Sequence, residues 1–399
     1  MDSFNSVVGV RTDEASGRYT MLAYLCLCVI LSLATWFSTT AILPQLKEHY
    51  ALGDTVTQWL GISVQLGFLV GAVTSTITGL SDRIPPKQLM IWSSVAAAVA
   101  NISILFVTEG AQLVALRIAS GAALAGVYPP ALKLISTWFV RGRGVAMGSI
   151  VGALTLGSAM PHLVNAFGGV DWRNVIIITT LLPLLSAFMV AMTVREGPFP
   201  FPKHKFDVKI IGATLSDRVF LLATFGYLGH MWELYAMWSW VLLLVRERFD
   251  QISDLSSLIT FAVIAAGAPA CIIAGRLADQ CSRTVIVIWS LLISGGCAAF
   301  VGFAYDIGPI TFILIAILWG ASAVSDSAQF SAIISEKCDP RFVGTALTAQ
   351  LGLGYALTLV TTWVLPAVSS YLGGWQWAFL ILVPGPVFGI VVMWKLSRQ

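Results

Sequence analysis

The chain has 399 residues, of which 57% are hydrophobic and 11% are charged, and its mean hydropathy is +0.84. Soluble domains carry about 25% charged residues, so this composition excludes an ordinary soluble protein and indicates a chain that crosses a membrane many times. The net charge of +3 is too small to indicate binding to nucleic acid. The six cysteines form no CxxC pair and have no histidine at metal-binding spacing, so we expect no disulfide framework, no metal and no cofactor.

A membrane-spanning helix needs about 20 mostly apolar residues, and this length locates the predicted elements. Residues 1–19 are polar, lack the apolar core of a signal peptide and are expected to form a cytoplasmic tail. The sequence then predicts an all-α integral membrane protein with twelve transmembrane helices. The twelve runs are 20–46, 56–80, 87–108, 111–138, 143–168, 174–194, 218–246, 255–278, 284–304, 308–335, 341–371 and 376–396.

One polar connection is much longer than the others. Residues 195–217, REGPFPFPKHKFDVKIIGATLSD, contain three prolines and four Lys or Arg residues. We interpret this segment as a cytoplasmic linker between two six-helix bundles. The N-terminal bundle is expected at residues 20–194 and the C-terminal bundle at residues 218–399.

The distribution of Lys and Arg predicts the orientation of the chain in the membrane. With the N-terminus inside, 17 of the 23 basic residues fall in inner loops and tails, and only four fall in outer loops. Cytoplasmic loops of membrane proteins carry this excess of positive charge. Both termini are therefore expected in the cytoplasm, with the helices in the cytoplasmic (inner) membrane.

The two predicted halves carry similar short motifs. FGGVDWR at 167–173 corresponds to LGGWQWA at 372–378, and TGLSDR at 78–83 corresponds to GRLADQ at 275–280. Paired halves with a binding site at their interface are the usual plan of secondary transporters. The repeats therefore indicate a transporter.

The TGLSDR and GRLADQ loops resemble the Gly-x-Leu-Ala-Asp-Arg-x-Gly-Arg-Lys motif of the major facilitator superfamily. LVALRIASGAA at 113–123 resembles the Leu-x-x-x-Arg-x-x-Gln-Gly-x-Gly-Ala motif that this family carries on helix four. The resemblance implies two pseudo-symmetric six-helix bundles, alternating access, and a loop motif whose Asp caps a neighbouring helix and whose basic residues gate the cytoplasmic side. The first copy departs from the family pattern at Thr78 and at Pro85-Pro86. The implied gate residues are Asp82, Arg83, Lys87, Gly275, Asp279 and Arg283.

The sequence of the fifth span indicates which subfamily of the superfamily the chain resembles. Drug antiporters of the superfamily carry Gly-Pro-x-x-Gly-Gly there, whereas this chain has GALTLGSAMPH at 152–162, without the adjacent Gly-Pro. Together with GYLGHMWELYAMWSW at 226–240, the stretch is similar to bacterial permeases grouped loosely with nitrate/nitrite and cyanate carriers. The resemblance implies a small solute, with an anion favoured.

Ionisable side chains inside membrane spans are costly and are functional candidates by default. Arg117 presents a planar fork of donors that suits planar oxyanions, so we expect it to be the main anion contact. The alternative is a structural pair with a carboxylate or with backbone carbonyls. Lys133 is expected to reach the inner membrane interface, and His162 to cap a broken turn.

His230 and Glu233 are three residues apart and share one helix face with Tyr227. We expect this face to meet a water-filled cavity, where Glu233 takes up and releases a proton and pairs with Arg117 when the cavity is empty. An internal hydrogen-bonded cluster that fixes helix packing is the alternative. Asp326 is expected to be either a second proton-coupling site or an inner-gate hydrogen bond.

Three further residues complete the predicted substrate contacts. Trp36 and Thr39 lie on the first span, and Tyr128 lies on the fourth. With Arg117 and the Tyr227–His230 face, they would surround a solute between the halves.

The leading hypothesis is a monomeric secondary active transporter, a symporter that takes up a small polar solute with protons. The alternatives are a proton-driven exporter of a small organic compound or metal chelate and a membrane sensor without transport. The chain contains no GxxxxGK[ST], HExxH or GxSxG motif, so neither direct ATP coupling nor an enzyme is expected.

Overall fold

The computed structural model describes residues 17–78, 80–139, 142–167, 171–199, 217–249, 253–337 and 343–398. Within these ranges the chain is almost entirely helical and contains no β-strand. Ten helical segments there are long and apolar enough to cross a membrane. The predicted all-α membrane fold is confirmed.

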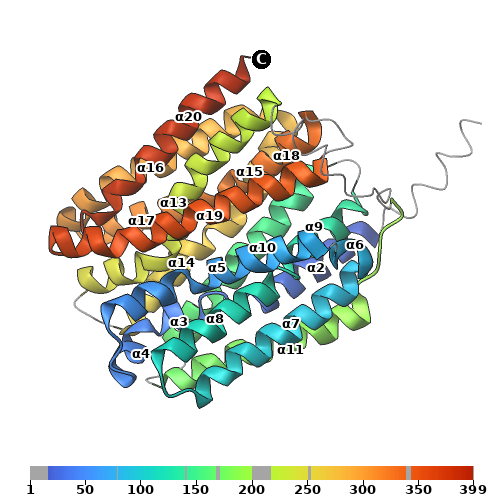
Figure 1. Cartoon of the computed structure of the whole chain (residues 1–399). Coiled ribbons are helices and arrows are strands. Elements are labelled where there is room, and N and C mark those ends of the chain that lie inside the picture. Colours follow the sequence, from blue (N-terminus) through green and yellow to red (C-terminus); the bar gives the residue numbers. More distant parts are fainter. Residues whose placement is uncertain are drawn as a thin grey trace, which may run out of the picture.

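The helices lie side by side in two groups (Figure 1). We call residues 17–199 the N half and residues 217–398 the C half. The N half contains α2 (Arg18–Leu33), α3 (Ser38–Ala41), α4 (Leu43–His49), α5 (Asp54–Thr78), α6 (Leu80–Arg83), α7 (Pro86–Ile102), η2 (Ser103–Phe106), α8 (Gly110–Leu124), α9 (Tyr128–Ser136), α10 (Arg143–Phe167) and α11 (Trp172–Thr193). The C half contains α13 (Arg218–Arg248), α14 (Ser253–Ala265), α15 (Gly267–Gln280), α16 (Arg283–Ile307), α17 (Pro309–Ser325), α18 (Ser327–Lys337), α19 (Val343–Leu372), η3 (Ala378–Leu382) and α20 (Pro384–Ser397).

Several predicted spans are interrupted helices. The first is divided into α2, α3 and α4, the fourth into α8 and α9, the eighth into α14 and α15, and the tenth into α17 and α18. Inside a bilayer, backbone that leaves the helix is tolerated only where protein or a water-filled cavity supplies polar partners. The interruptions therefore mark places where side chains from other helices must support the backbone.

The predicted linker falls largely outside the described residues, because only 195–199 and 217 of it are described. Trp138 Nε1 donates to the carbonyl of Arg195, at a distance of 3.1 Å. This hydrogen bond fastens the start of the linker to the end of the fourth span.

The seam between the halves runs along α10, which packs against α14 and α15. Gly144, Gly148 and Gly152 recur every four residues on one face of α10. A Cβ on Gly148 would lie 2.5 Å from the carbonyl oxygen of Cys271, and one on Gly152 would lie 2.7 Å from that of Ala268. Small residues let membrane helices approach backbone to backbone, so this stripe sets the distance between the halves.

The C-terminal end of α10 is also tied to the C half. The Asn165 amide donates to the Ser257 hydroxyl on α14, at 2.8 Å, and to the carbonyl of Ala41, at 3.0 Å. Gln45 in turn donates to the Asn165 side-chain oxygen. From Gly144 to Asn165 the helix rises roughly 32 Å, so the seam extends across a full membrane core.

Candidate functional site

Arg117 on α8 is fully buried and supports the interruption of the first span. One terminal nitrogen donates to the carbonyls of Thr35, at 2.8 Å, and of Trp36. The other donates to Ser38 Oγ, at 3.1 Å, and to Asn101 Oδ1, at 3.3 Å. The guanidinium fork thus binds backbone and side-chain oxygens of the first span, and it also binds the side-chain oxygen of Asn101 on the third span.

The acceptors of Arg117 are all neutral groups, and they all belong to the N half. Glu233 contacts a different set of residues in the C half. The expected pairing of Arg117 with Glu233 is therefore not formed in this structure. The structural alternative, in which Arg117 binds backbone carbonyls, describes its contacts.

His230, on α13, and Asp326 form a buried acid–base contact in the C half. His230 Nδ1 lies 2.9 Å from Asp326 Oδ1, and both side chains are 1% exposed. His230 Nε2 lies 2.7 Å from Ser327 Oγ, and the Tyr227 ring stacks on the imidazole with centroids 5.8 Å apart. Because Asp326 is the residue between α17 and α18, this pair fastens α13 to the interruption of the tenth span.

Glu233 lies one turn further along α13 and is also buried. Its Oε1 accepts a hydrogen bond from Trp319 Nε1 on α17, at 2.5 Å, and its Oε2 accepts one from Ser294 Oγ on α16, at 2.9 Å. The polar partners of both His230 and Glu233 therefore come from helices of the C half. This arrangement matches the internal-cluster alternative for the shared face.

A different face of α13 meets the N half. Rings from the two halves contact each other here: the Trp36 centroid lies 5.8 Å from that of Tyr235, and the Phe68 centroid lies 4.6 Å from that of Tyr355. Two more ring contacts join these residues across the halves, Trp36–Tyr355 at 6.4 Å and Phe37–Trp238 at 6.2 Å, while Trp59 and Trp363 form a separate contact at 5.1 Å. We call Trp36, Phe37, Phe68, Tyr235, Trp238 and Tyr355 the interface ring cluster.

Polar groups border the interface ring cluster. The hydroxyls of Tyr235 and Tyr355 lie 2.8 Å apart, and Gln65 on α5 donates to the Ser239 hydroxyl on α13, at 3.2 Å. Tyr128 is the first residue of α9 and is partly buried. Of the predicted substrate contacts, Trp36 thus takes part in the ring contacts between the halves.

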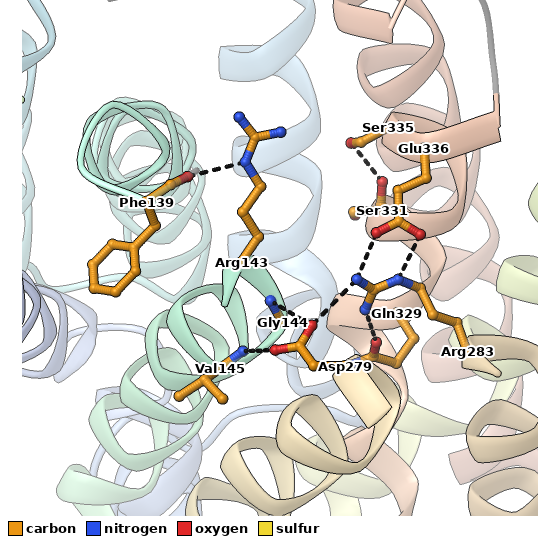
Figure 2. A network of polar contacts seen from close by, with 10 residues as sticks. All are labelled: Phe139, Arg143, Gly144, Val145, Asp279, Arg283, Gln329, Ser331, Ser335 and Glu336. Atoms are coloured by element: carbon orange, nitrogen blue, oxygen red, sulfur yellow. Dashed lines mark hydrogen bonds and ion pairs between the residues drawn. The ribbon is translucent and has the colours of Figure 1, made fainter. Parts of the chain in front are cut away.

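The loop motif of the C half forms a second link across the seam. Asp279, at the end of α15, accepts hydrogen bonds from the backbone N–H groups of Gly144 and Val145, each at 3.2 Å (Figure 2). A carboxylate at a helix N-terminus satisfies free N–H groups and complements the helix dipole. Gly275 lies one turn before Asp279, and a Cβ on it would meet the Gly144 carbonyl oxygen at 2.4 Å.

Arg283 completes this network. Its guanidinium binds both oxygens of Glu336, at 2.8 and 2.6 Å, and also contacts Gln329 at 2.8 Å and Asp279 at 3.4 Å (Figure 2). A pocket of about 460 Å³ lies beside the network and includes the exposed Cys281. The family resemblance implies that the Asp of this motif caps a neighbouring helix. Asp279 caps the N-terminus of α10 in this way.

The gate residues of the N half are described less completely. The side chain of Asp82 lies outside the described part of the structure. Arg83 ends the short helix α6 and is exposed, and Lys87 lies in the first turn of α7. Thr39, another predicted contact, is buried in α3 beside the residues that bind Arg117.

Sequence reasoning missed the residues that hold the ionisable groups in place. Asn101 donates to Thr179 and Thr180, both at 3.0 Å, while its oxygen accepts from Arg117. Trp319 and Ser294 were not singled out, although both bind Glu233. In the sequence, each of these residues is visible only as a polar or aromatic residue inside an apolar run. Such a residue does not show which side chain of another helix it will bind.

Comparisons with known proteins agree with this geometry. A model of the Major Facilitator Superfamily matches residues 25–357. The proton:xylose symporter XylE, solved with 6-bromo-6-deoxy-D-glucose, has a TM-score of 0.78 and 14% identity over 96% of both chains. A bacterial homologue of the human lysosomal transporter Spinster, in an inward-facing conformation, has a TM-score of 0.74 and 15% identity over 96% of this chain and 97% of its own. At these identities the likeness shows the fold.

Relatives found by sequence are also named as transporters. The probable sulfoacetate transporter SauU of Cupriavidus necator is 24% identical over 74% of this chain and 73% of its own length. The cephamycin export protein CmcT of Amycolatopsis lactamdurans is 24% identical over 54% of this chain and 45% of its own. The match across residues 25–357, the all-helical fold and the helix-capping Asp279 lead to one assignment: the chain belongs to the Major Facilitator Superfamily of membrane transporters.

Proposed function

We propose that this protein is a secondary active transporter that takes up a small organic anion together with protons. It works as a monomer of two six-helix bundles, residues 20–194 and 218–399, joined by the linker 195–217, which alternate access to a site between them. The observation that carries the proton coupling is the buried contact between His230 and Asp326 at the interruption of the tenth span.

The chemistry of this contact supports a proton-dependent step. His230 Nδ1 lies at ion-pair distance from Asp326 Oδ1, without the geometry of a hydrogen bond, and His230 Nε2 lies within hydrogen-bond distance of the Ser327 hydroxyl. A proton added to Asp326 removes the negative charge that attracts the His230 ring, and this weakens the link between α13 and the α17–α18 interruption. Loss of the proton restores the link, so the protonation state can bias which arrangement of the C half is stable.

Two observations support an organic anion. SauU, which matches 74% of this chain, is named as a probable transporter of sulfoacetate, a small organic anion. In addition, Arg117 places a positive charge directly behind the backbone of Trp36, at the edge of the interface ring cluster. Arg117 thus contributes positive potential to the interface while its donors remain bound to the first span.

Export of an organic compound is the second candidate. It is favoured by the aromatic character of the interface and by the partial match to an exporter of cephamycin. The direction of proton-driven movement distinguishes the two candidates.

The transport experiment uses purified protein in liposomes and the permanently charged probes sulfoacetate and benzenesulfonate. With an acidic exterior, we expect at least one labelled anion to accumulate inside above its external concentration. A protonophore should reduce this to simple equilibration, and protein-free liposomes should show no uptake. Accumulation only with an acidic interior would establish export instead. Equilibration that ignores the pH gradient would contradict proton coupling.

The proposed orientation places both termini and the Asp279–Arg283 network in the cytoplasm. Cys281 is exposed beside this network and provides a native probe. In a variant that retains only this cysteine, a membrane-impermeant maleimide should label Cys281 in inverted vesicles and spare it in right-side-out cells. A cysteine introduced at Asp54, on the first turn of α5, should show the opposite pattern. Labelling of both positions from the same side would overturn the topology.

A further inference from the structure

The interface ring cluster contains two buried donors that have no acceptor. Trp36 is 1% exposed and Trp238 is fully buried, yet among the described residues neither indole N–H has a hydrogen-bond partner. An unsatisfied buried donor costs about 1–3 kcal/mol, so native proteins rarely keep one without a reason. Two such donors in one cluster indicate a place where a ligand supplies the acceptors.

The two indoles belong to one site. Both rings contact Tyr235, with centroids 5.8 and 5.5 Å from it, and both contact Phe37, at 6.5 and 6.2 Å. Trp36 comes from the first span and Trp238 from α13, so the donors lie on opposite halves of the protein. The rocking of the two halves that transport requires would separate these rings and open the space between them.

Other indoles of α13 are used differently. Trp240 is equally buried, but its N–H donates to the carbonyl of Thr362 at 2.9 Å. Trp232 donates to the carbonyl of Ile381, also at 2.9 Å. The fold therefore satisfies these two indoles of the helix, and Trp238 is distinguished from them by its free donor.

We infer that the interface ring cluster binds an organic anion with a planar ring-bearing body and a carboxylate or sulfonate head. The inference rests on the proposed function and names the substrate class of its site. The head accepts hydrogen bonds from the Trp36 and Trp238 indoles, and Arg117 supplies positive potential from behind Trp36. The body takes the place of a ring–ring contact between the halves, such as Trp36–Tyr235.

This assignment predicts a particular selectivity. Indole N–H groups are donors only, so an anionic acceptor suits them and an ammonium group does not. A neutral amide of the same shape presents N–H groups of its own and loses the charge-assisted part of the interaction. An anion without a ring satisfies the donors but leaves the aromatic surface uncovered.

Binding to the purified full-length protein tests the inference without any proton gradient. Labelled benzenesulfonate and benzoate are the probes, and benzenesulfonamide, benzylamine and methanesulfonate are the competitors. We expect at least one probe to bind and none of the three competitors to displace it at matched concentration. Trp36→Phe and Trp238→Phe keep a ring and remove the N–H, and each should weaken binding about tenfold. Trp240→Phe is the matched control and should bind like the parent, because its donor serves Thr362.

Several results would overturn the inference. They are the absence of binding by both probes, equal competition by benzylamine or benzenesulfonamide, or unchanged affinity in both Trp36→Phe and Trp238→Phe. Proton-driven accumulation of sulfoacetate by a protein that binds neither ring-bearing probe would reject this substrate class and leave the proposed function standing. Binding of a probe without proton-driven accumulation of any anion would reject the proposed function and leave this substrate class standing.

Discussion

Arg117→Lys is expected to destabilise the protein strongly although the charge is retained. Arg117 serves four acceptors from one planar fork, including the carbonyls of Thr35 and Trp36 in the interrupted first span. A lysine ammonium has three donors on one atom and cannot span these positions. With two or more buried acceptors deprived of donors, we expect a loss of roughly 2–4 kcal/mol, measured as a lower thermal denaturation midpoint of the purified protein.

Ser38→Ala provides the matched control for this prediction. Ser38 accepts from Arg117 and donates to Asn101 Oδ1 at 2.8 Å, so its removal leaves the other three contacts of the guanidinium in place. We expect a smaller loss of stability than in Arg117→Lys. An Arg117→Lys protein as stable as the parent would show that the fork does not support the interruption.

The sequence predicted the spans well because hydropathy and length determine them directly. The run predicted at 143–168 is α10, Arg143–Phe167, and the run at 284–304 lies within α16, Arg283–Ile307. The motif of the C half was also informative, since Gly275, Asp279 and Arg283 meet α10 and α18 as a capping network requires. These features depend on local sequence or on a spacing that a family motif preserves.

The interruptions could not be predicted in the same way. The residues around the first interruption, Ala34–Phe37, include neither glycine nor proline. Their backbone leaves the helix because Arg117, more than 70 positions away, supplies donors there. Only the tertiary structure reveals such a partner.

The faces of the seventh span show the same limit. Helical spacing correctly grouped Tyr227 and His230, which stack on each other. It did not indicate that the partners of His230 and Glu233 would come from α16, α17 and α18, while Tyr235 and Trp238 would meet the N half. Aromatic residues occur on every side of α13 itself, so their spacing does not show which face of the helix turns towards the N half.

The contacts of the two carboxyl groups separate their proposed roles. Glu233 is held by donors within the helical turns of α16 and α17, whereas Asp326 occupies the interruption between α17 and α18. Glu233→Gln keeps an acceptor but turns an NH₂ group towards Trp319 Nε1 or Ser294 Oγ. We therefore expect Glu233→Gln to lower stability and to retain proton-driven accumulation at a reduced rate.

Asp326→Asn is expected to abolish proton-driven accumulation while exchange of labelled for unlabelled anion continues. Asparagine has nearly the same shape and keeps a polar oxygen beside His230 Nδ1, so the contact between α13 and the interruption survives in a single, proton-independent form. Without a group that gains and loses a proton, the pH gradient has no means of biasing the two arrangements of the C half. The measurement compares net accumulation with counterflow in liposomes for the parent, Asp326→Asn and Glu233→Gln. Accumulation by Asp326→Asn together with its loss in Glu233→Gln would transfer the coupling role to Glu233, because the variant that cannot accumulate solute has lost the proton site.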